Sequence, residues 1–81
     1  MLAKVVVTLK KSVLDPQGVA VKSALASMGY GAVGDVRLGK YMELRLSGTD
    51  AKKAEQELKE ICDKLLANPV IEEYKYEIVK E

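Results

Sequence analysis

The hydrophobic pattern of this chain changes period at Asp15, and the change marks the boundary between its first two elements. From Ala3 to Leu9 every second residue is apolar and several residues are β-branched, which predicts a strand. Asp15 can cap a helix, and Pro16 suits the first helical position because its missing N–H has no intrahelical partner there. Gly18 then lies in the first turn, where glycine costs up to about 1 kcal/mol relative to alanine. We therefore expect another backbone, or a partner, to approach Gly18 closely.

Two helices are predicted, each with an apolar stripe. The first runs from Pro16 to a stop at Gly29, and the second runs from a cap at Asp50 to a stop at Asn68-Pro69. Apolar residues recur at i, i+4, i+7 spacing in both, so each helix has one face to cover. The stripe residues are Val21, Leu25 and Met28 in the first helix, and Ala54, Leu58, Ile61 and Leu65, with Cys62 and Leu66 beside them, in the second.

Three more strands are expected, over Val33–Leu38, Tyr41–Ser47 and Val70–Val79, with a tight turn at Gly39-Lys40 joining the first two. The resulting order is βαββαβ, which is typical of an α+β, ferredoxin-like domain. Such a domain has a four-stranded antiparallel sheet with both helices on one face. Residues 1–81 are predicted to form one domain. Its uncovered face would expose several apolar residues and tyrosines, and a second copy of the chain is the simplest cover. These residues are Leu2, Val6, Ile71, Tyr74, Tyr76 and Val79.

The composition also points to a subunit interface. The chain has 81 residues, of which 48% are hydrophobic, although it contains no Phe and no Trp. A domain this short buries only about 60–65% of the surface that its unfolded chain exposes. The apolar content exceeds what one thin core needs, so we expect the surplus to cover a surface shared between subunits.

Charge and segment lengths exclude several classes of partner. The formal net charge is +1 and both signs alternate along the chain, so no field attracts nucleic acid or an anionic membrane. The uncharged stretch that contains Met28–Gly34 is too short to span a bilayer, and the apolar run after Lys4 is too short for a signal peptide. One cysteine allows no internal disulfide. We expect a cytoplasmic protein.

Few residues carry chemistry. The chain has no histidine, and Cys62 lies within the second helical stripe, where a buried core thiol is expected. Arg37 and Lys40 flank the predicted turn, where they either hold an anion or are solvated cations. Glu72-Glu73 is either directed to a metal or protects an edge strand. We predict no catalytic residue, no metal ligand and no cofactor in this chain.

Five segments together resemble one known family. They are Val5–Lys10, Val13–Gly18, Leu25–Tyr30 with its final Met-Gly-Tyr, Val36–Lys40 and Cys62–Glu72. In order and spacing they resemble the PurS family, the small subunit of phosphoribosylformylglycinamidine synthase, over essentially the whole chain. The resemblance implies a PurS-like form of the α+β fold predicted above.

The resemblance also implies a function in purine biosynthesis. A glutaminase subunit (PurQ) would release ammonia from glutamine, and a synthetase subunit (PurL), using ATP and Mg, would add it to formylglycinamide ribonucleotide. The PurS-like chain would be a non-catalytic dimer, or a tetramer, that bridges the two subunits and supports ammonia transfer. Asp15–Gly18 would form a rigid corner facing a partner, and Arg37 and Lys40 would meet acidic groups or line a polar passage. The full set of candidate interface residues is Leu14, Asp15, Pro16, Gln17, Gly18, Arg37, Gly39, Lys40, Leu65, Leu66, Asn68, Pro69, Val70, Ile71 and Glu72.

Two other classes of function remain open from the sequence. One is a stand-alone regulatory domain of ACT-like shape that binds a small molecule. The other is a small enzyme that uses Arg37 and Lys40 on a phosphorylated substrate, against which the missing general base argues.

Overall fold

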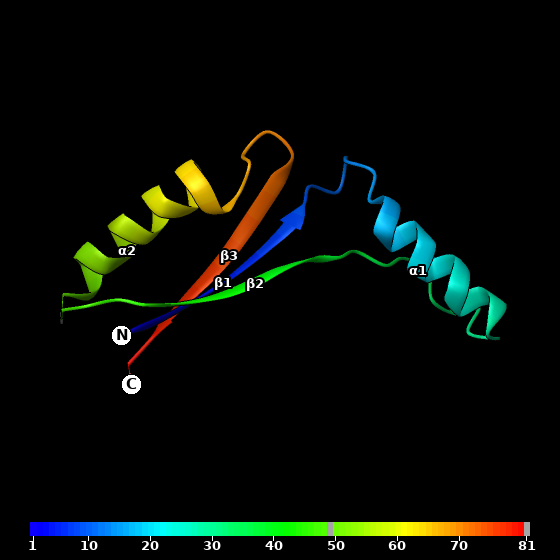
Figure 1. Cartoon of the computed structure of the whole chain (residues 1–81), viewed down its shortest axis with the longest axis horizontal. Coiled ribbons are helices and arrows are strands. Elements are labelled where there is room, and N and C mark those ends of the chain that lie inside the picture. The colour runs from blue at the N-terminus through cyan, green and yellow to red at the C-terminus, as the bar shows by residue number, and fades with distance from the viewer. Residues whose placement is uncertain (49, 81) are drawn as a thin grey trace.

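A computed structural model describes residues 1–48 and 50–80; Thr49 and Glu81 of the predicted domain lie outside the described residues. Three strands form one antiparallel sheet in the order β2-β1-β3 (Figure 1). This confirms the α+β class with an antiparallel sheet and two helices. The elements in chain order are β1 (Leu2–Leu9), α1 (Pro16–Ser27), β2 (Gly39–Arg45), α2 (Ala51–Ile61), the π-helical turn η1 (Cys62–Leu66) and β3 (Glu72–Val79).

The core lies between the sheet and α2. On β1, the odd-numbered residues Ala3, Val5 and Val7 are fully buried, as are Leu58 and Cys62 on the helical side. The alternation along β1 therefore predicts the covered face correctly, and Cys62 is the buried thiol that the sequence predicts. Partly buried residues of the flanking strands and of the second helical segment complete the core: Met42, Leu44, Leu46, Leu66, Tyr74, Tyr76 and Ile78.

The end of the second helix departs from a regular α-helix. The N–H of Ala67 donates to the carbonyl of Cys62 at 2.9 Å, a five-residue spacing that widens the last turn. The wider turn brings Leu66 and Ala67 onto the core and leaves Leu65 79% exposed. The prediction that Leu65 continues the buried stripe is therefore wrong, because it assumes a regular helical period up to Asn68.

The strand predicted over Val33–Leu38, and the turn at Gly39-Lys40, are wrong. Gly39 and Lys40 begin β2, whose first residue pairs with Thr8. Because β1 ends at Leu9, residues 33–38 run past the end of their neighbouring strand, and no described strand pairs with them there. The described part of the chain thus forms three strands rather than four.

Helix α1 lies beyond the end of the sheet rather than over its face, which corrects the predicted placement (Figure 1). Gly18 is its only buried residue, and Val21 and Met28 of its predicted apolar face are 39% and 69% exposed. The radius of gyration is 16.2 Å, whereas a compact domain of this length has about 12 Å. We call α1 and residues 28–35 the arm, and the sheet with α2 and η1 the body.

The open face of the sheet carries fewer apolar residues than the sequence predicts. Tyr74 and Tyr76 lie on the face covered by α2, in register with Val7 and Val5, so they need no second cover. Of the apolar residues on the open face, Val6 is 42% exposed and its register partner Tyr41 is 58% exposed. Around Val6, strand register places Lys4 opposite Glu43 on one side and Glu77 on the other. No described helix is both long and apolar enough to cross a bilayer.

Candidate functional site

A corner joins the arm to the body, and Asp15 is its centre. One carboxylate oxygen, Oδ1, accepts from the N–H of Gly18 at 3.0 Å, which is the helix cap that the sequence predicts. The other, Oδ2, accepts from the N–H of Leu38 at 2.8 Å. Asp15 is 4% exposed. One side chain therefore begins α1 and also fastens it to the segment that enters β2.

Gly18 allows the two segments of this corner to approach each other. A Cβ atom at Gly18 would overlap the carbonyl oxygen of Val36, so alanine does not fit without a shift of backbone. This confirms the expectation that another backbone approaches Gly18 closely, and it shows that this backbone belongs to the same chain. Gly39 is equally confined, because its Cβ would overlap the carbonyl oxygen of Val7.

Arg37 closes the corner from the other side. Its Nη2 atom donates to the carbonyls of Lys10 at 2.8 Å and Val13 at 2.9 Å, and more weakly to that of Leu9 at 3.4 Å. These carbonyls belong to the end of β1 and the loop before α1. Arg37 therefore has an internal structural role that the sequence does not predict.

Electrostatics favour the ionised form of Asp15. The N–H groups of Leu38 and Gly18 hold the pKa of the Asp15 carboxyl below its ordinary value, the Arg37 guanidinium adds to this, and burial opposes it. In the body, the phenol of Tyr76 donates to Glu55 Oε1 at 2.6 Å and lowers the pKa of that carboxyl. The sequence does not predict this second pair, because its two members lie 21 residues apart.

A hollow of about 300 Å³ opens where the corner meets the sheet. Its polar groups include the exposed side chain of Gln17, which can donate and accept, and Lys40. Such a hollow suits a polar side chain of another protein. It is lined by Val7, Leu9, Asp15, Gln17, Leu38, Gly39, Lys40 and Glu72.

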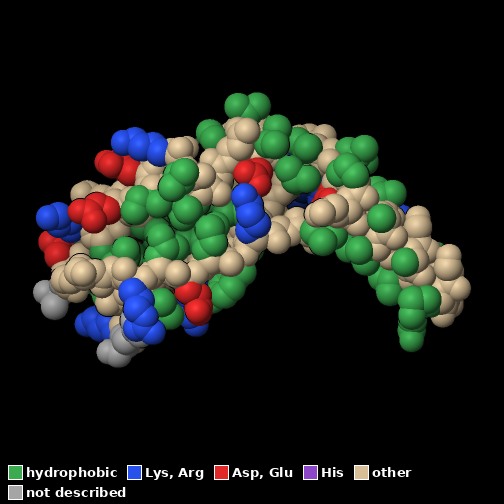
Figure 2. All heavy atoms as spheres, in the orientation of Figure 1, with side chains coloured by type: hydrophobic (Ala, Val, Ile, Leu, Met, Phe, Trp, Pro, Cys, Tyr) green, Lys and Arg blue, Asp and Glu red, His purple; other side chains and the backbone are tan. Residues whose placement is uncertain are grey.

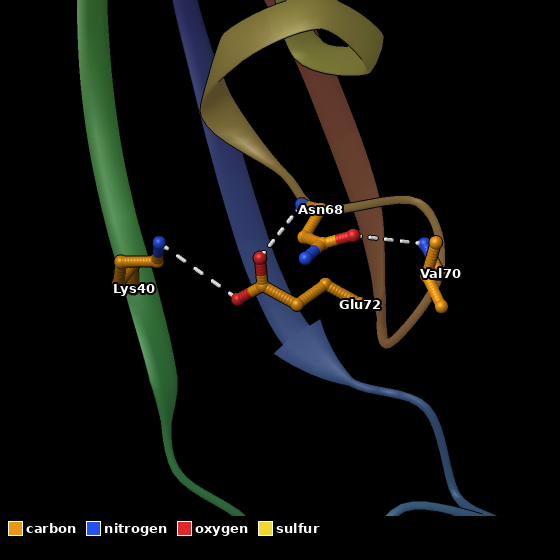
Figure 3. A network of polar contacts seen from close by, with 4 residues as sticks. All are labelled: Lys40, Asn68, Val70 and Glu72. Atoms are coloured by element: carbon orange, nitrogen blue, oxygen red, sulfur yellow. Dashed lines mark hydrogen bonds and ion pairs between the residues drawn. The ribbon is translucent and has the colours of Figure 1, made fainter.

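Glu72 organises a second polar network at the same end of the sheet as the corner (Figure 3). Its Oε1 atom accepts from the N–H of Asn68 at 2.7 Å, and its Oε2 atom lies 3.8 Å from the Lys40 ammonium. Asn68 Oδ1 in turn accepts from the N–H of Val70 at 3.1 Å. Glu72 is thus used within the chain, and the described residues include no group of three or more His, Cys, Asp or Glu side chains placed to hold a metal ion.

The predicted site residues fall into three groups. Asp15, Gly18 and Arg37 meet in the corner, and Gln17, Gly39, Lys40 and Glu72 line the hollow beside it. A second group is exposed and apolar: Leu14, Pro16, Leu65, Pro69, Val70 and Ile71. The remaining two, Leu66 and Asn68, support the core and the loop before β3. Sequence reasoning misses the backbone groups of Val36, Leu38 and Lys10, which complete the corner and carry no side-chain signal.

Known proteins match this chain over nearly its whole length. Residues 2–80 match the family described as PurS, phosphoribosylformylglycinamidine (FGAM) synthase. The chain is 59% identical over 75 residues to the PurS subunit of Bacillus subtilis, covering 93% of this chain and 88% of that protein. It is 38% identical over 78 residues to the PurS subunit of Methanocaldococcus jannaschii, covering 96% and 94%.

Solved structures agree with the sequence matches. The crystal structure of Bacillus subtilis PurS superposes with a TM-score of 0.88 at 56% identity, covering 98% of each chain. A chain of the structure described as PurLQS from Thermotoga maritima gives 0.83 at 32% identity, covering 98% of this chain and 99% of that one. These matches show that the chain belongs to the PurS family, whose members are a subunit of phosphoribosylformylglycinamidine synthase in purine biosynthesis.

Proposed function

We propose that this chain is the non-catalytic assembly subunit of its synthase, joining a glutaminase of PurQ type to an ATP-dependent synthetase of PurL type. The observation that carries the proposal is its likeness, along 98% of its length, to a chain of the PurLQS structure. In this proposal the chain supports the transfer of ammonia from glutamine to formylglycinamide ribonucleotide. ATP and Mg are used by the synthetase subunit, and the assembly is cytoplasmic.

Self-association is the first part of the proposal. The accessible surface is 6054 Å² for a chain of 8.9 kDa, whereas a folded monomer of that mass exposes about 4,800 Å². The excess is about 1,200 Å² per chain, so two chains that bury it would form an interface larger than the standard size of about 1,600 Å² in total. The arm accounts for the excess, because α1 is exposed on nearly every side.

A second copy suits the arm better than solvent does. Isolated helices of 12 residues are marginal in water, and Lys22 is the one charged residue of α1. Among the residues that the structure describes, no strand lies beside the extended residues 33–38. In a homodimer in which each copy covers the arm of the other, α1 is no longer isolated and residues 33–38 have a neighbour. A tetramer would be a pair of such dimers.

Docking on the other subunits is the second part. The exposed members of the predicted interface set remain available for it. The corner fixes the backbone beside Leu14 and Gln17, and the bonds of Asn68 and Glu72 fix the loop that carries Val70 and Ile71. The proposal assigns this role to Leu14, Gln17, Leu65, Pro69, Val70 and Ile71.

Reconstitution tests this function. Purified synthetase and glutaminase are assayed for ATP turnover on formylglycinamide ribonucleotide, with and without the chain, once with glutamine and once with ammonium salt. The chain should raise the glutamine-driven rate and leave the ammonia-driven rate nearly unchanged, because it couples two subunits and takes no part in the chemistry. Equal glutamine-driven rates with and without the chain would overturn the proposal.

A further inference from the structure

Two loops meet at the end of the sheet that carries the corner, and they expose apolar side chains there. Leu14 is 72% exposed, Val70 is 77% exposed and Ile71 is 39% exposed. The N–H of Lys10 donates to the carbonyl of Ile71 at 2.8 Å, which ties the loop after β1 to the loop before β3. Figure 2 shows hydrophobic side chains gathered along this upper edge of the molecule. We call Leu14, Val70 and Ile71 the apolar tip.

The backbone under the apolar tip is fixed by hydrogen bonds. Asn68 donates its N–H to Glu72 Oε1 at 2.7 Å and accepts from the N–H of Val70 at its side chain (Figure 3). Its carbonyl also accepts from the N–H groups of Ile71 at 3.1 Å and Glu72 at 2.7 Å. A loop held this way loses little freedom on binding, so Val70 is preorganised as an anchor for a partner's pocket.

The charges in the loop that carries Leu14 are basic, whereas the exposed carboxylate of Glu73 lies at the start of β3, on the open face of the sheet. Lys10 and Lys11 lie in the loop that carries Leu14, and among the described residues neither forms an ion pair. The nearby carboxylate of Glu72 is engaged by Asn68 and Lys40, and its side chain is only 16% exposed. An approaching surface therefore meets an apolar centre bordered by two available ammonium groups.

This charge pattern disfavours a second copy at the tip. A two-fold contact sets the same patch against itself, which would bring the lysines of both copies together around an apolar centre. Complementary potentials instead require carboxylates on the opposite surface. Val70 and Ile71 also belong to the loop before β3, and not to the exposed length of α1 that the proposed dimer covers.

We propose that the apolar tip docks into an apolar pocket rimmed by carboxylates on a different protein. The proposal rests on the proposed function, in which that protein is one of the two enzyme subunits. Val70 fills the pocket, Leu14 and Ile71 cover its mouth, and the ammonium groups of Lys10 and Lys11 face the carboxylates. The arm and the tip then have separate roles, self-association for the first and attachment of an enzyme subunit for the second.

The test compares wild type with Val70→Asp, using Val70→Leu as the matched control. The Val70 side chain is exposed and its N–H bond to Asn68 is a backbone contact, so both variants should keep the unfolding midpoint of wild type. Binding of the chain to each purified subunit is measured by biolayer interferometry, and its mass by light scattering. Val70→Asp should weaken binding to at least one subunit by about tenfold or more while the mass stays that of wild type. Val70→Leu should bind within about twofold of wild type.

A charge series sharpens this test. Lys11→Glu should slow association at low salt by about three- to tenfold, and the difference should vanish near 0.5 M salt because screening removes it. Lys75→Glu, on the open face of the sheet, is the control and should leave the association rate unchanged at both salt concentrations. If Val70→Asp binds both subunits as tightly as wild type, the role of the apolar tip is overturned and the proposed function stands. The same conclusion follows if Val70→Asp loses self-association. A wild-type chain that binds neither subunit overturns the proposed function as well.

Discussion

Helices α1 and α2 both begin at an aspartate whose carboxylate accepts from the first turn, Asp15 from Gly18 and Asp50 from Lys52 and Lys53. Beyond that turn they differ. Helix α2 lies against the sheet and buries Leu58, whereas α1 buries only Gly18 and projects away from it. Apolar packing therefore holds α2, and directed polar contacts at a single corner hold α1.

The contacts that stabilise the fold therefore differ from the contacts that set the direction of the arm. Packing in the body is shared by three strands and a helix, so its loss should unfold the whole chain. The corner is small, and its bonds fix the direction of the arm without adding to the core. We therefore expect the arm and the body to open as separate cooperative units, with the arm opening at the lower free energy.

The largest effect is expected in the body, from Leu58→Ala. Leu58 is fully buried between α2 and the sheet, so truncation leaves a cavity and should cost about 2–5 kcal/mol of unfolding free energy. Urea denaturation followed by circular dichroism measures this cost. Leu65→Ala, at a 79% exposed position of the same helical segment, should change stability by no more than about 0.5 kcal/mol. Equal costs for the two variants would contradict the assignment of the core.

Gly18→Ala should release the arm and spare the body. Its Cβ would overlap the Val36 carbonyl, and relieving such overlap costs about 1–3 kcal/mol. Amide hydrogen exchange followed by mass spectrometry should show faster exchange in α1 and unchanged exchange in β1. Gly34→Ala is the control, because a Cβ there meets no atom within 4 Å. Faster exchange in β1 to the same degree would show that arm and body are one unit.

Arg37→Ala should weaken self-association and glutamine-dependent turnover while the body stays folded. The substitution leaves the carbonyls of Lys10 and Val13 without their shared donor, at a cost of about 1–3 kcal/mol within the corner. Light scattering across a dilution series measures the dimer, and circular dichroism checks the body. Arg37→Lys keeps the charge without the planar guanidinium and should fall between wild type and Arg37→Ala. Unchanged dimerisation and turnover in Arg37→Ala would remove the corner from the assembly mechanism.

The features that can be predicted from the sequence are those with a local signal. Both aspartate caps, the alternation along β1 and the burial of Cys62 follow from residue type and spacing. The crowding at Gly18 is also predictable, since glycine in a first helical turn needs a reason. That the neighbour is the Val36 carbonyl is not predictable, because a backbone oxygen carries no side-chain signature.

The errors concern what covers a face. An alternating pattern over residues 33–38 indicates an extended chain with two faces, but it does not say whether a neighbouring strand is still present. Here β1 ends at Leu9 and leaves the segment unpaired. Likewise the spacing of Val21, Leu25 and Met28 identifies a face of α1 but not its partner, and the structure shows that the sheet of the same chain does not provide it. These two errors lie in the arm or directly beside it, where the proposed function places a second copy.

The smallest expected effect is a response of the arm to acid. The folded-state pKa of Asp15 lies below its ordinary value of 3.8, chiefly because the N–H groups of Leu38 and Gly18 donate to its carboxylate. A lowered pKa means that the ionised form favours the closed corner. Its contribution is therefore complete above the ordinary pKa and is lost as pH falls through the folded-state pKa. Hydrogen exchange in α1 should quicken, beyond its intrinsic pH dependence, as the solution is taken below about pH 4.

Two variants separate the arm from the body in this titration. Asp15→Asn removes the ionisable group, so α1 should exchange faster than in wild type near neutrality and show no further acid release. Glu55 also has a lowered pKa, because Tyr76 donates to it, so the body loses stability in the same direction on acidification. Glu55→Gln removes that contribution and should leave the acid release of α1 in place. If Glu55→Gln abolished the release instead, acid would act on the arm through the body, and the corner would not be an independent unit.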